Sequence, residues 1–223
     1  MPTRLIAACD GACKGNPGPA SWAWVIADAD EQVLRWQSGP LGDATNNIGE
    51  LTALEQLLTA VDATADVEVR MDSQYAINCV TTWLPGWKAK GWTTSAKKPV
   101  ANKELIMRIE GLMNDRTGAV KLVYVPAHQV GGDRLNDLAD RAAAATALSQ
   151  RAMRGTSADE VPEAVDDVQP RKGPSKGKPA RSGAPVVITA KFSGTCSCGS
   201  GYKAGEKIAK GPSGWGHTGC AAS

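Results

Sequence analysis

A break in hydrophobic periodicity near residue 148 constrains the fold more than any other feature of this sequence. From residue 3 to that point apolar positions recur at strand and helix spacing, whereas the next stretch loses the pattern and gains prolines. Its acidic run from Asp159 to Asp167 precedes its later basic run from Arg171 to Arg181. We interpret the stretch as a solvated tether, with a weak phosphate-binding arm as the alternative. The sequence therefore predicts a folded domain over 1–148, a flexible linker over 149–185 and a small module over 186–223.

The pattern of the first region predicts an α/β fold. Strands are expected over 4–11, 21–28, 33–39, 67–73 and 121–127, and helices over 46–63, 73–84, 101–115 and 134–152. Three consecutive strands favour an antiparallel meander. The later alternation of helices and strands favours a mixed sheet with helices packed on its faces.

Composition excludes several classes of protein. The net charge of +2 is too small to indicate a partner, and no stretch forms a signal peptide or approaches the ~18 apolar residues of a membrane span. We therefore expect a cytoplasmic protein with no membrane partner. We also expect a monomer. Cys9, Cys13 and Cys79 lack a metal-like spacing and are expected to be buried thiols.

Four carboxylates stand near the ends of predicted strands or within predicted helices, namely Asp10, Glu50, Asp72 and Asp140. Taken singly, each has a structural explanation at a helix N-terminus, as a cap, or in a pair with a neighbouring arginine. Taken together, they predict a shared site, because clustered like charges are costly unless a divalent cation neutralises them. All-oxygen ligation favours Mg²⁺ or Mn²⁺, and two such ions about 4 Å apart support phosphodiester hydrolysis.

Four stretches resemble type 1 ribonuclease H over residues 4 to about 147. They are CDGACKGNPGPASWAW, TNNIGELTAL, MDSQYAINCVTTWLPGWKAKGWTTSAKKPVANKEL, and VPAH followed by NDLADRAA. The third is particularly specific, because three tryptophans, paired lysines and PVxN occur in that order. The resemblance implies a five-stranded mixed sheet flanked by helices. It also implies an endonuclease that cuts the RNA strand of RNA/DNA hybrids and leaves 5′-phosphate and 3′-hydroxyl ends.

The resemblance assigns the catalytic residues one by one. Asp10, Glu50 and Asp72 match the family's metal ligands without gaps. The fourth ligand is open between Asp137 and Asp140, because the loop HQVGGDRLN is longer than in the familiar bacterial form; we prefer Asp140, which keeps the spacing NxxADxxA. His128 follows VPA at the position of the family histidine that assists proton transfer or product release.

The resemblance also implies contacts to the hybrid. The minor groove, where the 2′-hydroxyl distinguishes RNA from DNA, would be read by backbone groups of Gly11, Ala12 and Cys13 and by the side chains of Asn16, Asn46, Asn47 and Gln74. The DNA strand would be held by Thr45 and Asn102 at a phosphate and by Trp87 at a sugar.

The stretch 83–103 contains five lysines and no acidic residue, and three tryptophans lie among them. It resembles the family's basic protrusion, so its lysines are expected to contact phosphates: Lys88, Lys90, Lys97, Lys98 and Lys103. Trp83 and Trp92 have a second interpretation, as core anchors of a helix pair.

The C-terminal module is expected to bind one structural Zn²⁺ ion through Cys196, Cys198, His217 and Cys220. Fewer than 40 residues rarely fold without such a staple. The spacing resembles treble-clef-like and zinc-ribbon-like modules, but CxC stands where CxxC is commoner. A disulfide with one odd thiol and an unmetallated tail are the alternatives. Both nucleic acid and protein are open as partners, and four lysines (Lys191, Lys203, Lys207 and Lys210) slightly favour nucleic acid.

Two functions of different classes are compatible with the first region. One is a ribonuclease H endonuclease, and the other is a non-catalytic module that keeps the fold and binds hybrids. The four carboxylates and His128 are all present, which favours the enzyme. Resolvases, transposases and integrases share the fold but lack the TNN and WKxxGW segments.

Overall fold

The computed structural model describes residues 4–127, 132–164, 187–196, 198–211 and 214–220. The chain divides into two compact units, Met1–Asp166 and Asp167–Ser223, each with its own sheets.

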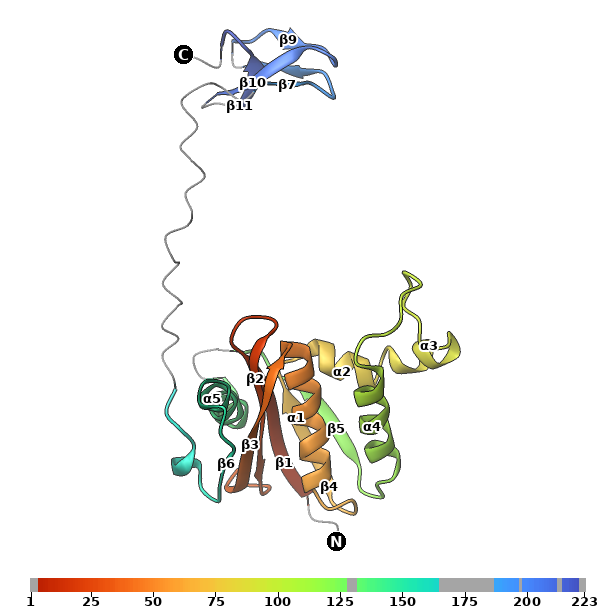
Figure 1. Ribbon diagram of the computed structural model, residues 1–223, viewed down its shortest axis with the longest axis vertical. Helices are drawn as coiled ribbons and strands as arrows, with labels where there is room; N and C mark the ends of the chain where they lie inside the picture. The colour runs from red at the N-terminus through yellow and green to blue at the C-terminus, as the bar shows by residue number, and fades with distance from the viewer. Residues whose placement is uncertain (1–3, 128–131, 165–186, 197, 212–213, 221–223) are drawn as a thin grey trace. The chain divides into compact units, whose positions relative to one another are not determined.

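A six-stranded mixed sheet forms the centre of the large unit (Figure 1). The strands β1 (Arg4–Cys13), β2 (Gly18–Ala27) and β3 (Val33–Ala44) pair antiparallel, which confirms the predicted meander. On the other side of β1, β4 (Asp66–Met71) and β5 (Val120–Tyr124) are added in parallel. A short sixth strand, β6 (Met153–Gly155), pairs with β3 and completes the order β5-β4-β1-β2-β3-β6.

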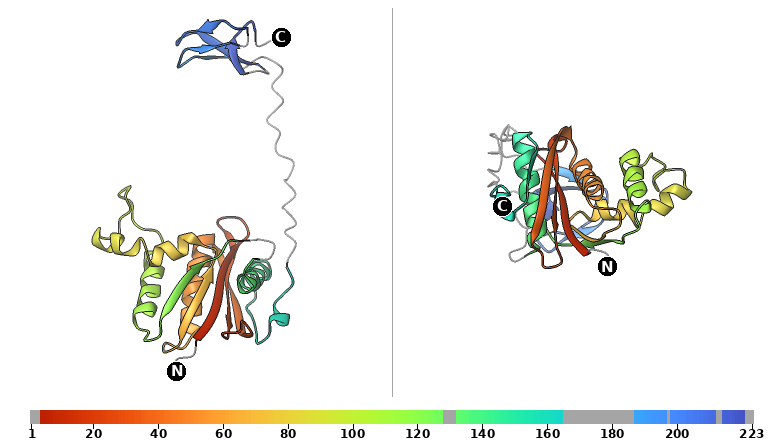
Figure 2. Two further views of the ribbon diagram at one scale, coloured as in Figure 1. Left: turned by 180° about the vertical axis from the view of Figure 1, so that it is seen from behind. Right: turned by 90° about the horizontal axis from the view of Figure 1, so that it is seen from below.

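Helices cover both faces of this sheet (Figure 2). One face carries α1 (Asn46–Ala60), α2 (Gln74–Val80) and α4 (Lys103–Asn114), and the other carries α5 (Arg134–Ser149). In β1, Ala7 and Cys9 belong to the core under α1, whereas Ile6 and Ala8 belong to the core under α5. The continuous apolar run of β1 is therefore explained by burial on both sides.

Short polar side chains fix where the helices begin. Thr45, Ser73 and Asp133 each accept a hydrogen bond from a backbone N–H in the first turn of α1, α2 and α5. We expected one helix over 73–84, but α2 ends at Val80 and α3 (Leu84–Ala89) begins separately. Pro85 explains the break, because proline lacks the N–H that a continuing helix requires and is tolerated in a first turn.

The large unit extends beyond the boundary that we expected at residue 148. After β6, the 3-10 turn η1 (Ala158–Glu160) leads into Val161, which is buried in the α5 core. The Trp36 indole N–H donates to the Ser157 carbonyl at 3.1 Å, and Arg141 donates to the Pro162 carbonyl at 2.9 Å. Residues 149–163, which we placed in the linker, therefore pack on the sheet and α5. A three-residue strand carries too little periodicity to be recognised in a sequence.

The small unit contains two small sheets. β7 (Val187–Thr189), β10 (Lys207–Gly211) and β11 (Gly214–His217) form one, and β8 (Gly194–Thr195) and β9 (Gly201–Tyr202) form the other. The buried apolar residues among its described positions are Ala190, Cys196, Ile208 and Ala209. Within the described ranges of the chain, no helix has the length and apolar character of a membrane span.

Candidate active site

The parallel register of β1 and β4 brings Asp10 and Asp72 together. The last paired residues of this ladder are Ala8 and Arg70, so Asp10 and Asp72 each lie two residues further along the chain than this pair. We expected Asp10 to close a strand, but β1 continues to Cys13 because its other edge stays paired with β2. Asp10 thus lies where the β1–β4 ladder ends, not where β1 ends.

Glu50 is positioned by the first turns of α1, which lie directly on β1. A Cβ atom at Gly11 would overlap the backbone of Gly49 and Glu50, and one at Gly49 would lie 2.8 Å from the Ser21 carbonyl oxygen. Both positions therefore require glycine for α1 to approach the sheet this closely. One turn before Glu50, the Asn46 amide donates to its carboxylate at 3.3 Å.

The three carboxylates form a tight, buried group. One oxygen from each of Asp10, Glu50 and Asp72 lies within 4.8 Å of the other two, and Asp10 and Glu50 are each 5% exposed. Burial, and then the negative charge of Glu50, raises the pKa of Asp10 well above its usual range. Burial, and then the charge of Asp72, raises the pKa of Glu50 to about 8. Among the described residues, Glu50 Oε2 is buried and has no hydrogen-bond partner.

The two candidates for a fourth carboxylate differ in their surroundings. Asp140 is half-buried and lies outside the 4.8 Å group, but its charge is one of the causes that raise the pKa of Asp10. The side chain of Asp137 is 66% exposed and pairs with Arg141 at 3.6 Å. These surroundings favour Asp140. His128 lies outside the described residues, so its role stays a prediction.

Two residues that we did not select from the sequence support the acidic group, one by direct contact and one by joining the elements around it. Asn136 is buried and donates its amide to the Asp72 carboxylate at 3.4 Å. Arg70 pairs at 2.7 Å with both Glu31 and Asp133, which ties the end of β4 to the N-cap of α5. Asn136 could have been selected from the sequence, because it is the first residue of the NxxAD spacing. Arg70 could not have been selected in this way, because its partners are distant in the sequence.

The residues expected to read the minor groove gather at the same end of the sheet. Gly11, Ala12 and Cys13 end β1, and Gln74 begins α2 beside Asp72. The Asn46 N–H donates to Asn16 Oδ1 at 3.3 Å, which joins the β1–β2 turn to the start of α1. The structure therefore places these backbone and amide groups around the carboxylates.

The residues expected to hold the DNA strand lie at helix starts and on α3. Thr45 and Asn102 are the N-cap residues of α1 and α4, and the Asn102 amide donates to the Tyr75 hydroxyl at 3.3 Å. Trp87 is half-buried, with its ring 5.6 Å from that of Trp83. Asn47 is exposed in the first turn of α1.

The basic stretch forms α3 and a loop that projects from the rest of the large unit (Figure 1). Lys90, Lys97 and Lys98 are exposed on it. Lys88 is exposed too but donates to Glu110 at 2.7 Å, and Lys103 lies over the Trp92 ring at 5.5 Å. These two cations are therefore already partly engaged.

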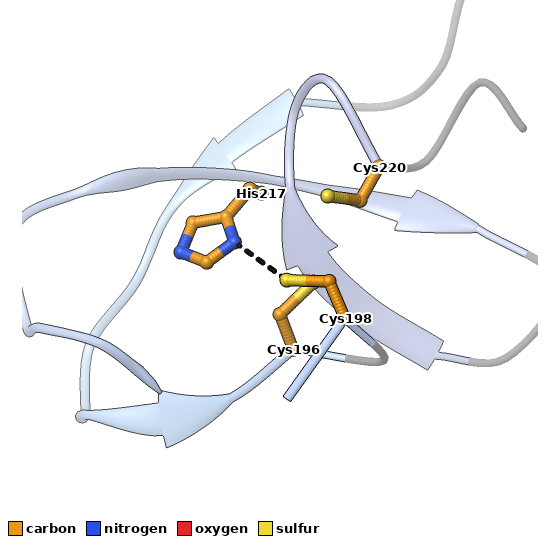
Figure 3. A group of neighbouring side chains, drawn as sticks. All are labelled: Cys196, Cys198, His217 and Cys220. Carbon is orange, nitrogen blue, oxygen red and sulfur yellow. Dashed lines mark hydrogen bonds between the residues drawn. The ribbon is translucent and has the colours of Figure 1, made fainter. Parts of the chain in front are cut away.

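A second group of ligand-type side chains lies in the small unit (Figure 3). One atom from each of Cys196, Cys198, His217 and Cys220 lies within 4.8 Å of the others, and Cys198 Sγ lies 3.6 Å from His217 Nδ1. The structure thus brings together all four side chains that the spacing had singled out.

Comparison with known proteins identifies relatives of both units. The family model for RNase H matches residues 2–148. A ribonuclease HI from Streptomyces coelicolor is 56% identical over 227 residues, which cover 99% of this chain and 97% of that protein. A ribonuclease H from Tropheryma whipplei (strain Twist) is 42% identical over 138 residues, or 61% of this chain and 80% of that protein. The first match therefore includes the small unit.

Solved structures share the fold at low sequence identity. LC9-RNase H1, a type 1 RNase H with the type 2 active-site motif, aligns with a TM-score of 0.60 and 20% identity over 70% of this chain and 79% of its own. The PFV RNase H domain aligns with a TM-score of 0.57 and 24% identity over 67% of this chain and 97% of its own. Such a likeness shows the architecture alone.

Proposed function

Since the chain belongs to the type 1 ribonuclease H family and is a ribonuclease H enzyme, we propose that it hydrolyses the RNA strand of RNA/DNA hybrids at internal positions. The expected products carry 5′-phosphate and 3′-hydroxyl ends. The observation that carries this proposal is the convergence of Asp10, Glu50 and Asp72 within 4.8 Å at one end of the sheet.

The acidic group fits two Mg²⁺ or Mn²⁺ ions. All its donors are oxygens, Glu50 keeps a buried oxygen without a hydrogen-bond partner among the described residues, and burial raises the pKa of both Asp10 and Glu50. A cation would offset the repulsion that these groups experience when ionised. Asp140 would complete the set. Such ions, when bound, activate a water and neutralise charge on the scissile phosphate and the departing oxygen.

Other residues of the chain would orient this chemistry. The amides of Asn46 and Asn136 hold the carboxylates of Glu50 and Asp72. Arg70 fixes the start of α5, the helix that carries Asp140. We assign His128 to proton transfer or product release, so its loss should lower the rate without abolishing it.

Hybrid specificity would come from groups that surround the carboxylates. The backbone of Gly11–Cys13 and the amides of Asn16, Asn46, Asn47 and Gln74 offer donors and acceptors to a 2′-hydroxyl. Thr45, Asn102 and Trp87 would hold the DNA strand. The exposed lysines at the end of α3 and on the loop that follows it (Lys90, Lys97 and Lys98) would contact phosphates.

The small module would add affinity for nucleic acid. Residues 186–223 contain four lysines against one acidic residue, Glu206, and Phe192 is 81% exposed where a base can stack on it. Deletion of 187–223 should weaken hybrid binding at fixed salt and leave the turnover of bound hybrid unchanged. Equal hybrid affinity would contradict this role and leave a protein as the partner to seek.

The decisive experiment compares cleavage of a labelled RNA/DNA hybrid with that of an RNA duplex and a DNA duplex, with Mg²⁺ or Mn²⁺ added. Asp72→Asn should lower hybrid cleavage on the order of 10³-fold, because it removes one charged ligand but little volume. Asp115→Asn is the matched control, since Asp115 is exposed at the end of α4. Full activity of Asp72→Asn would sink the proposed mechanism.

The alternative is a module that binds hybrids without cutting them. The same samples distinguish this module from the enzyme. The alternative requires that the wild-type chain retard the labelled hybrid in a gel and leave it intact with either metal. The presence of every expected carboxylate favours the enzyme.

A further inference from the structure

The small unit holds a site whose chemistry is unrelated to phosphodiester hydrolysis. We propose that Cys196, Cys198, His217 and Cys220 bind one structural Zn²⁺ ion, and that this ion is what keeps the small unit folded. The proposal is independent of the catalytic one, because the acidic group of the large unit contributes no ligand to it.

The donor set and its spacing suit zinc. Three thiolates and one imidazole form a Cys₃His set, which selects a soft or borderline metal over Mg²⁺ or Mn²⁺. Zn–S bonds of about 2.3 Å and Zn–N bonds of about 2.0 Å at tetrahedral angles place a sulfur and a nitrogen donor about 3.5 Å apart. Cys198 Sγ and His217 Nδ1 are 3.6 Å apart. Figure 3 shows the four side chains directed toward a common centre.

Four protein ligands close the coordination sphere. A catalytic zinc keeps one position for water or substrate, whereas a structural zinc is held by four protein donors in a tetrahedron. All four donors here come from the protein and lie within 4.8 Å of one another, so a tetrahedral ion bound by all four would have no position left for a reacting molecule. The arrangement therefore assigns the ion a structural role.

The ligands come from two sheets that share no ladder. Cys196 and Cys198 lie in the turn between β8 and β9, whereas His217 ends β11 and Cys220 follows it. Gly199 adopts a φ of +86° in the first turn, and its N–H donates to the Cys196 carbonyl at 2.9 Å. One ion would join the β8–β9 hairpin to the three-stranded sheet.

Apolar burial alone does not account for this unit. Among its described residues, the buried apolar ones are Ala190, Ile208, Ala209 and Cys196, and Cys196 is itself one of the proposed ligands. Chains this short usually need a metal or disulfides to fold. The cysteines of the cluster are free thiols in the structure, and three thiols cannot all pair with one another. Metal binding is the one cross-link that uses all four side chains.

Gly216 offers a test that leaves every ligand in place. A Cβ atom there would collide with Cys196 Sγ, whereas one at Gly219 would meet nothing within 4 Å. Gly216→Ala should therefore displace a ligand sulfur, and Gly219→Ala should not. The two substitutions are chemically identical and lie three residues apart.

The experiment measures zinc in the purified full-length chain by mass spectrometry of the elements, after dialysis against a weak chelator. We expect about one zinc per chain for wild type, Gly219→Ala and Cys79→Ala, whose cysteine lies outside the cluster. Cys198→Ser and Cys220→Ser should lose the zinc, and Gly216→Ala should lose most of it. Hydrogen exchange should show that residues 187–211 lose protection in the variants that lose zinc.

Several results would overturn the proposal: a wild-type chain without zinc, a mass lower by two hydrogens that reports a disulfide, or zinc retained by Cys198→Ser. Protection of 187–211 that persists after zinc is lost would overturn the folding role. Hybrid cleavage is scored separately on the same samples. A chain that binds zinc but cleaves nothing, or the reverse, therefore shows which proposal has failed.

Discussion

The two groups of side chains that we propose as metal ligands differ in how the surrounding fold supports them. Asp10, Glu50 and Asp72 repel one another, and two apolar cores on the faces of a six-stranded sheet hold them together. Cys196, Cys198, His217 and Cys220 have almost no core around them. In the large unit, the fold determines how the carboxylates are arranged. In the small unit, we infer that the metal ion bound by the four side chains determines the fold.

Because of this difference, we expect the two units to differ in whether they stay folded when metal is absent. A buried acidic group costs stability that the rest of the large unit must offset, so that unit can stay folded without its ions. A small unit that depends on one ion has little apolar burial among its described residues to offset the conformational entropy of its chain. Changes to metal, ligand or boundary should therefore affect the two units in different ways.

Removing all metal should produce the largest contrast. Structural zinc supplies about 10–16 kcal/mol of apparent folding free energy in small zinc modules, so a strong chelator should unfold the small unit. The large unit should keep its fold and lose only activity. Hydrogen exchange of the full-length chain measures both, with peptides from 187–211 set against those from β1, α1 and α5. Equal protection of the two units after chelation would remove the contrast.

The fourth carboxylate gives the next largest effect. Asp140→Asn should lower kcat on a hybrid by about 10²–10³-fold, because Asp140 is the candidate whose charge reaches Asp10. Asp137→Asn should change kcat by less than a factor of about three, since it loses only an exposed pair with Arg141. Steady-state rates at saturating hybrid measure both variants. The reverse ranking would move the ligand by one helical turn.

The four carboxylates differ in how far the sequence alone could predict their positions. The nearness of Asp10 to Asp72 could be expected from the sequence, because each carboxylate follows a run of apolar residues and neighbouring parallel strands bring such positions to one end of a sheet. The choice between Asp137 and Asp140 depended on a loop of different length, so spacing alone left it open. The contact of Asn136 with Asp72 depends on how α5 packs against β4, and no local pattern expresses that packing.

The boundary of the large unit was misplaced for a related reason. β6 has three residues, too few to show a period, and Val161 stands between Glu160 and Pro162, outside any strand or helix. Their stabilisation comes from tertiary contacts, namely pairing with β3 and burial beside α5. The return of apolar and turn residues near residue 186, together with three clustered cysteines, predicted a small module without reference to such contacts.

Truncation tests this corrected boundary. A chain that ends at residue 148 loses β6, buried Val161 and the hydrogen bond from Trp36, so the large unit should lose about 2–4 kcal/mol of stability. A chain that ends at 166 keeps all three and should melt like the large unit of the full-length protein. Each kcal/mol should shift the Tm by about 2–4 °C in thermal unfolding. Identical Tm values would return the boundary to 148.

The smallest effect tests the claim that the acidic group strains the large unit. Burial raises the pKa of Glu50 to about 8 in the folded protein. In the unfolded chain, the same carboxyl group has an ordinary pKa of about 4.3. Between these values the folded state holds more protons, so without metal the free energy of unfolding should fall as pH rises from 5 toward 8. Asp10→Asn removes one of the repelling charges. It should therefore stabilise the metal-free protein, by about 1–2 kcal/mol at pH 8 and less at pH 5.

Denaturant unfolding in the presence of chelator measures this effect, with Asp115→Asn as the exposed control. Added Mg²⁺ should reduce the difference in free energy of unfolding between Asp10→Asn and wild type. Ions that bind the folded wild type stabilise it by mass action, and they should bind Asp10→Asn less tightly. An Asp10→Asn variant that is less stable than wild type at pH 8 without metal would mean that hydrogen bonds to Asp10, such as that from the Gly11 N–H, outweigh the repulsion. The carboxylates would then contribute to the fold much as the cysteines do, and the contrast between the two units would be one of degree.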